Sequence, residues 1–230
     1  MAARASGEWL TLALLCALGW ATALSPGGAL ADTGICAQVS TLSLDRGWTN
    51  LTIGLLFNTP GRLMLDWAAM VAAMTPLLMA RPLGDPLGRT AMPRRRAGIW
   101  PFAAAYGAVW LAAGVALVPA ALWLAGAVPA SGWGALAVLI ALGVAWRVTP
   151  FHRFGLDLCR QRPRPGSPTA LHACAITGLR HGLGCLLTCW PMMVLPIAVH
   201  RQHAAAMLIA GALQLADRWR DRAPPFISRT

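Results

Sequence analysis

Lysine is absent from this chain of 230 residues, and acidic residues are scarce. All 19 residues of the Lys and Arg class are arginine, against 8 Asp and Glu, and charged residues make up only 12% of the sequence. A soluble domain normally carries about 25% charged residues. The shortage of charge therefore argues against a soluble globular protein.

Several catalytic signatures are also missing. The sequence contains no Gly-rich phosphate-binding loop, no paired-carboxylate arrangement and no nucleophile elbow, which argues against phosphoryl transfer and hydrolysis. It has no Cys-x-x-Cys pair and no haem-attachment motif. We therefore expect that the protein is not an enzyme.

Apolar residues dominate what is present. They form 57% of the chain, whose mean hydropathy is +0.57. A helix that spans a bilayer needs about 20 mostly apolar residues, and six segments approach that length. They are residues 9–24, 63–80, 99–124, 132–148, 178–199 and 204–219. The sequence predicts an all-α fold, a polytopic membrane bundle of about six transmembrane helices that forms one integral membrane domain over residues 1–230.

The arginines gather in alternate gaps between these segments. Residues 81–96 hold five arginines against one aspartate, and residues 147–180 hold six against one, whereas the other gaps carry almost no net charge. Cytoplasmic loops of membrane proteins are enriched in basic residues. The pattern therefore predicts a multi-pass protein of the bacterial inner membrane with both termini in the cytoplasm.

The net charge of +11 is explained by this topology and by contact with anionic lipid. No aromatic-plus-basic recognition motif interleaves with the arginine clusters, so we expect the lipid bilayer as a partner and no nucleic acid.

Two stretches near the N-terminus admit alternatives. Residues 1–31 form either the first span or a cleaved signal peptide that ends at Ala29-Leu30-Ala31. Cleavage would leave five spans and an external N-terminus. Residues 51–57 either lie along the membrane interface or extend the helix that follows.

The densest group of potential metal ligands lies in segment 178–199. His181, Cys185 and Cys189 are spaced four residues apart, and Met192 and Met193 follow three and four residues later. Residues three and four apart share a helix face, so we expect an imidazole, two thiols and a thioether in one stripe. Such ligands favour Cu(I) first and zinc second. One helix cannot enclose an ion, so a neighbouring helix must supply further ligands.

Segment 63–80 offers those ligands, because Asp66, Met70 and Met74 repeat the same spacing. An aspartate inside a membrane is a functional-site candidate by default, although Asp66 is near enough to its segment end to reach interfacial water. His200 and His203 lie on the predicted external turn, as either a metal entry point or an exposed interfacial pair. Plain packing is the alternative for both stripes, since Cys and Met also serve as buried apolar residues.

Three stretches resemble a known bacterial family. They are a Trp/Met-rich helix at residues 67–76, a Thr-Pro segment at residues 149–160 that leads to Cys159-Arg160, and a Gly-rich start followed by Cys185, Cys189-Trp190 and Met192-Met193. A shorter element around Tyr106-Gly107 is similar to the family's Gly-Tyr…Trp element. The family is that of the predicted metal-binding integral membrane proteins, and the resemblance covers about residues 60–218. It implies a multi-spanning membrane fold with a metal site.

The sequence departs from that family at three positions. Gly155 and Thr188 stand where the family has cysteines, and Thr75 stands where it has a methionine. The ligand types that the resemblance implies and that this chain retains are Cys159, Cys185, Cys189, Met70, Met74 and Met193.

Two functions follow from these patterns. The first is a membrane protein that binds a soft metal ion, copper before zinc, for storage, delivery or assembly. The alternative is a non-catalytic accessory subunit of a larger membrane complex, because 11 Trp and 23 Gly suit helix packing against other membrane subunits. A small-solute transporter would need a polar path, and only Asp66 and Asp217 are acidic within the segments.

Overall fold

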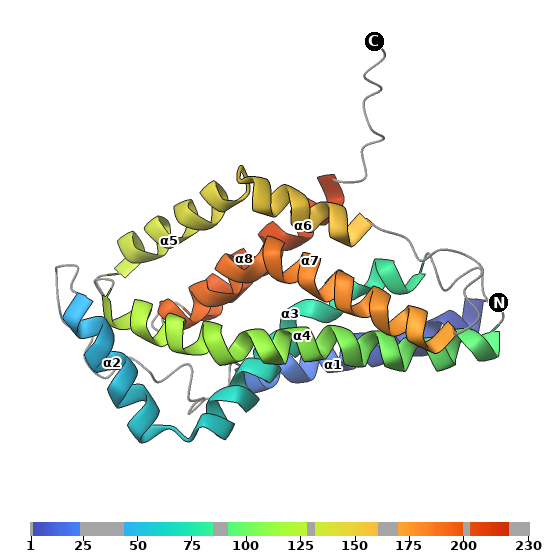
Figure 1. Cartoon of the computed structure of the whole chain (residues 1–230), viewed down its shortest axis with the longest axis horizontal. Helices are drawn as coiled ribbons and strands as arrows, with labels where there is room; N and C mark the ends of the chain where they lie inside the picture. The colour runs from blue at the N-terminus through green and yellow to red at the C-terminus, as the bar shows by residue number, and fades with distance from the viewer. Residues whose placement is uncertain are drawn as a thin grey trace, which may run out of the picture.

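The computed structural model describes residues 2–23, 44–84, 92–127, 132–160, 170–199 and 203–220. Every regular element within these ranges is a helix, so the predicted all-α class is confirmed. The helices are α1 (Ala2–Ala23), α2 (Leu44–Phe57), α3 (Pro60–Gly84), α4 (Met92–Ala127), α5 (Gly132–Trp146), α6 (Pro150–Arg160), α7 (Ala170–Ala198) and α8 (His203–Arg220). The 36-residue α4 runs along the long axis of the molecule, and α7 lies between it and α6 (Figure 1).

Each of the six apolar segments falls on one helix, namely α1, α3, α4, α5, α7 and α8. By length and composition, two stretches of the described chain could cross a membrane: Ile99–Ala127 in α4 and Leu171–Ala198 in α7. Helix α5 has 15 residues, about 22 Å at 1.5 Å per residue, which is shorter than a bilayer core of about 30 Å. Six crossings with both termini inside therefore stay a prediction.

The two alternatives near the N-terminus have different outcomes. Residues 29–31, the expected cleavage site, lie outside the described residues. Residues 51–57 do not extend α3, because they end the separate helix α2, and Asn58 and Thr59 interrupt the chain before Pro60. Pro60 is the first residue of α3, a position that its fixed φ suits. The buried Asn50 side chain fastens α2 to α4 by donating to the Leu122 carbonyl at 2.7 Å.

Glycines bring α4 and α7 close together. A Cβ on Gly178 would collide with the backbone of Phe102, and one on Gly182 would lie 3.1 Å from Val109 Cβ. Small residues at such points let helix backbones approach and gain packing contacts. The close approach allows long side chains of α4 to reach the middle of α7.

Helix α6 was not expected, because its sequence is too polar and too short to span a membrane. Thr149 precedes it and accepts a hydrogen bond from the His152 N–H at 3.3 Å, and Pro150 occupies its first position, so both N-terminal helix signals are present. The helix packs tightly on α7, since a Cβ on Gly155 would lie 2.9 Å from the Gly184 carbonyl oxygen.

A proline in α7 is matched by a side chain from α5. Pro191 has no N–H to donate to the Leu187 carbonyl one turn earlier. The indole N–H of Trp146 donates to that oxygen instead, at 2.8 Å. The Trp146 ring also meets Trp190 edge-on with centroids 5.2 Å apart. These contacts join the end of α5 to α7 one turn from Cys185.

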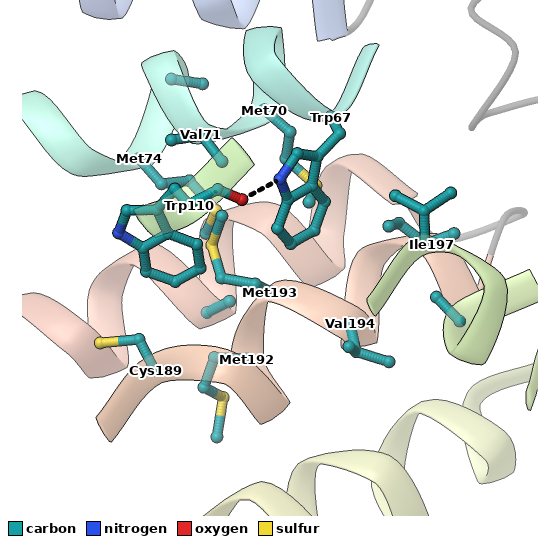
Figure 2. Packing of buried hydrophobic residues seen from close by; sticks show 14 of the residues in the cluster. Trp67, Met70, Val71, Met74, Trp110, Cys189, Met192, Met193, Val194 and Ile197 are labelled. Atoms are coloured by element: carbon teal, nitrogen blue, oxygen red, sulfur yellow. Dashed lines mark hydrogen bonds between the residues drawn. The ribbon is translucent and has the colours of Figure 1, made fainter. Parts of the chain in front are cut away.

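One buried apolar cluster joins α3, α4, α7 and α8. Its largest fully buried members include Trp67 and Trp110, and the Trp67 indole donates to the Trp110 carbonyl at 2.8 Å (Figure 2). Sulfur-bearing side chains are unusually common in it: Met70, Met74, Cys185, Cys189, Met192, Met193 and Met207. The cluster thus contains most of the side chains that the sequence analysis predicts as metal ligands.

Candidate metal centre

Cys185 and Cys189 form the centre of the candidate site. They lie one turn apart on α7, at 0% and 6% exposure, and their Sγ atoms are 3.9 Å apart. The hydroxyl of Thr188 lies 3.3 Å from Cys189 Sγ and also bonds the carbonyls of Gly184 and Cys185, each at 3.0 Å. The structure thus brings the two predicted thiols into one buried pair.

Tyr106 of α4 completes this pair from the facing helix. Its side chain is 1% exposed, and its hydroxyl donates to Cys185 Sγ at 3.2 Å. Sequence reasoning did not assign it a role at the site, because Tyr106 is 79 positions away and spacing reveals only neighbours on the same element. The one signal in the sequence that pointed to Tyr106 was the similarity of the stretch around Tyr106-Gly107 to the predicted metal-binding integral membrane proteins.

His181 begins the predicted stripe one turn before Cys185. It is 5% exposed, and its ring lies against α4, with centroids 6.0 Å from Phe102 and 6.3 Å from Tyr106. Within the described residues, no three His, Cys, Asp or Glu side chains come close enough to hold one ion. His181 therefore does not join both cysteines as a third ligand in this structure.

The methionines of the stripe diverge. Met193 points from α7 toward α3, where Met70 and Met74 lie, whereas Met192 points to the other side of the helix (Figure 2). Met192 packs against α5, since a Cβ on Gly143 would collide with its terminal methyl group. The two side chains thus lie on different sides of α7, and the metal-ligand role expected for each stays a prediction.

The three predicted ligands on α3 differ in how deeply they are buried. Met70 and Met74 are 1% and 5% exposed and belong to the same buried cluster as the cysteines. Asp66, one turn earlier, is half-buried. Met207 of α8 is fully buried in the cluster and was missed, because nothing in the sequence indicates which face of α8 turns toward α7.

Two further residues differ from expectation or add to it. His203, predicted on an external turn, is buried, and its Nδ1 lies 2.8 Å from the Pro196 carbonyl oxygen, while His200 is outside the described residues. Cys159 of α6 is half-buried, with Sγ 3.9 Å from the His181 carbonyl oxygen. Neither residue is part of the dithiol pair.

A protein-family model described as "PpoB2: Copper chaperone" matches residues 64–229, well over half of the chain. The matched region includes Met70, Met74, Tyr106, Cys185 and Cys189. Comparisons with curated proteins and with solved structures gave no match.

Proposed function

We propose that this chain, which belongs to the PpoB2 copper chaperone family, is a membrane protein that holds Cu(I) at the dithiol of Cys185 and Cys189 for delivery to another protein. Copper is then a cargo rather than a resident cofactor. The observation that carries the proposal is the buried pair of sulfurs 3.9 Å apart, within the region that the family model matches.

The sulfur separation suits a shared ion. Metal–thiolate bonds, as measured at zinc, are about 2.3 Å long, so two sulfurs that bind one ion lie at most about 4.6 Å apart. The observed 3.9 Å falls inside that limit without movement of the helix. Each thiol must lose its proton when it binds the ion, so loading releases protons.

The surrounding ligand types favour Cu(I) over zinc. A structural zinc site uses four Cys, His or carboxylate ligands, and no three such side chains cluster in the described parts of the chain. Thioethers and thiolates select Cu(I), and Met193, Met70 and Met74 share the buried cluster with both cysteines. We propose that these thioethers supply the additional soft ligands.

The exposure of α4 supports a location in the bilayer. The most apolar 18-residue stretch of Ile99–Ala127 is only 28% buried, and Val115 on that helix is 69% exposed. A core helix of a soluble protein would instead bury such residues. With the alternating arginines of the sequence, this exposure favours a multi-pass inner-membrane protein with its apolar faces toward lipid.

Copper binding by purified protein tests the proposal. The full chain in detergent is titrated anaerobically with Cu(I) in competition with a chromophoric Cu(I) chelator. We expect about one tightly held Cu(I) per chain, and Cys185→Ser combined with Cys189→Ser should abolish it because both thiolates are lost. Cys174→Ser is the matched control, since Cys174 is a half-buried thiol on the same helix outside the cluster.

Two outcomes would reject the proposal: a wild-type protein that takes up no Cu(I), or a double variant that binds it as tightly as the wild type. Native separation in mild detergent addresses the accessory-subunit alternative. A chain that migrates at its own mass while it binds copper argues against that role.

A further inference from the structure

Tyr106 is the only tyrosine in the chain, and its hydroxyl forms a hydrogen bond with a cysteine. The side chain is fully buried, and the O–H donates to Cys185 Sγ at 3.2 Å. A buried tyrosine usually needs a partner for its hydroxyl. Here the partner is one of the two proposed copper ligands, and the proposed ligand set gives the phenol no role.

The phenol is held in place by its neighbours. The rings of Tyr106, Phe102 and His181 form a triangle, in which the Tyr106 centroid lies 6.4 Å from that of Phe102 and 6.3 Å from that of His181, and the latter two lie 6.0 Å apart. The glycine contacts of Gly178 and Gly182 fix α4 against α7 on either side of that ring. The hydroxyl therefore reaches the turn of α7 that begins at His181 and ends at Cys185.

The hydrogen bond from Tyr106 would stabilise the negative charge that the dithiol carries when copper is bound. One Cu(I) and two thiolates together carry one negative charge, which would lie in an apolar cluster at residues that are 0% and 6% exposed. An unpaired buried charge is costly, and a hydrogen bond from a neutral donor to a charged acceptor is stronger than one between neutral groups. The Tyr106 O–H is already directed at one of the two sulfurs.

We propose that Tyr106 is a positioning residue that orients Cys185 and stabilises the negatively charged copper-loaded dithiol, and thereby sets the affinity for Cu(I). This inference rests on the proposed function. Tyr106 contacts a ligand rather than the ion. Partners that orient metal ligands typically change metal affinity by about 10- to 100-fold when they are removed.

Tyr106→Phe removes the hydroxyl and keeps the ring. In the chelator competition we expect it to bind one Cu(I) per chain with affinity about 10- to 100-fold lower than wild type. Trp146→Phe is the matched control, because it deletes a hydrogen bond of similar kind that ends on a backbone carbonyl of the same helix. It should leave the affinity for Cu(I) within about threefold of wild type. That change is smaller than the loss of about 10- to 100-fold that is expected when a hydrogen-bond partner of a metal ligand is removed.

A second measurement keeps the Tyr106 hydroxyl in place and does not depend on the folding of the Tyr106→Phe variant. Because Tyr106 is the only tyrosine, protein that carries 3-fluorotyrosine bears fluorine on that ring alone, and its ¹⁹F NMR signal reports the surroundings of Tyr106. Addition of Cu(I) should shift this signal in step with copper uptake. The same addition to the Cys185→Ser protein should leave it unmoved.

The outcomes separate the two proposals. If the wild type binds Cu(I) but Tyr106→Phe binds it equally well and the fluorine signal does not move, Tyr106 has no role at the site and the copper function stands. If Tyr106→Phe melts at a lower temperature with unchanged affinity, its role is packing and the inference is wrong. If the wild type binds no Cu(I), both proposals fall.

Discussion

At the residue scale, Thr188 places a hydroxyl 3.3 Å from Cys189 Sγ, within reach of the proposed copper site. A thiol at this position would add a third soft ligand beside the existing pair. We expect Thr188→Cys to raise the affinity for Cu(I) by about tenfold or more, which corresponds to roughly 1.4 kcal/mol.

Thr177→Cys is the control for this change. Thr177 also bonds the carbonyl four residues earlier, at 2.7 Å, but lies three turns away from Cys189. Its replacement should leave the Cu(I) affinity unchanged in the same chelator competition. Equal gains in both variants would indicate non-specific thiol binding rather than a third ligand.

The sequence indicated the central residues and missed their surroundings. The four-residue spacing of Cys185 and Cys189 specified one helix face, since helical periodicity depends only on local geometry. It could not identify Tyr106, because a periodic pattern does not reveal which helix packs opposite. The direction of the Met192 side chain could not be predicted either, because it depends on the space beside Gly143 of α5.

At the element scale, the site depends on how closely α4 and α7 approach. We expect Gly178→Ala to destabilise the protein by about 1–3 kcal/mol, because its Cβ would meet the Phe102 backbone, which has no room to move. Gly107→Ala on α4 meets nothing within 4 Å and should be neutral or stabilising by up to about 1 kcal/mol.

Thermal unfolding of both variants in the same detergent, followed by circular dichroism at 222 nm, measures this difference. A melting temperature for Gly178→Ala at or above that of the wild type would show that the helix contact tolerates a side chain. The comparison is matched because both changes add one methyl group within a helix.

Elements were predictable to the extent that they are apolar. Lipid and the need for internal hydrogen bonds make a long apolar run helical, which is why six segments were found. Helices α2 and α6 have 14 and 11 residues, so a search for apolar runs of about 20 residues does not find them. For α6 the N-terminal signals Thr149 and Pro150 were present in the sequence and were not used.

At the scale of the whole molecule, the multi-pass membrane location and its orientation are the main predictions to test. The arginine-rich residues 94–96 lie in the first turn of α4, and the positive-inside rule assigns them to the cytoplasm. We expect a cysteine introduced by Arg95→Cys, in a chain with Cys36→Ser, to react with a membrane-impermeant maleimide in inverted vesicles and not in intact spheroplasts. The native Cys36 lies in the gap between the first two apolar segments, which the same rule places outside, and it should behave oppositely. Labelling of position 95 from outside would overturn the topology.

The single-turn spacing of the two thiols has a chemical consequence. A disulfide requires a sulfur–sulfur bond of about 2.05 Å and Cβ atoms about 3.5–4.5 Å apart, whereas Cβ atoms four residues apart on a helix lie about 5–6 Å from each other. Oxidation therefore cannot form a disulfide between Cys185 and Cys189 unless that turn of α7 unwinds. The helix geometry therefore protects the proposed copper-binding dithiol from intramolecular oxidation.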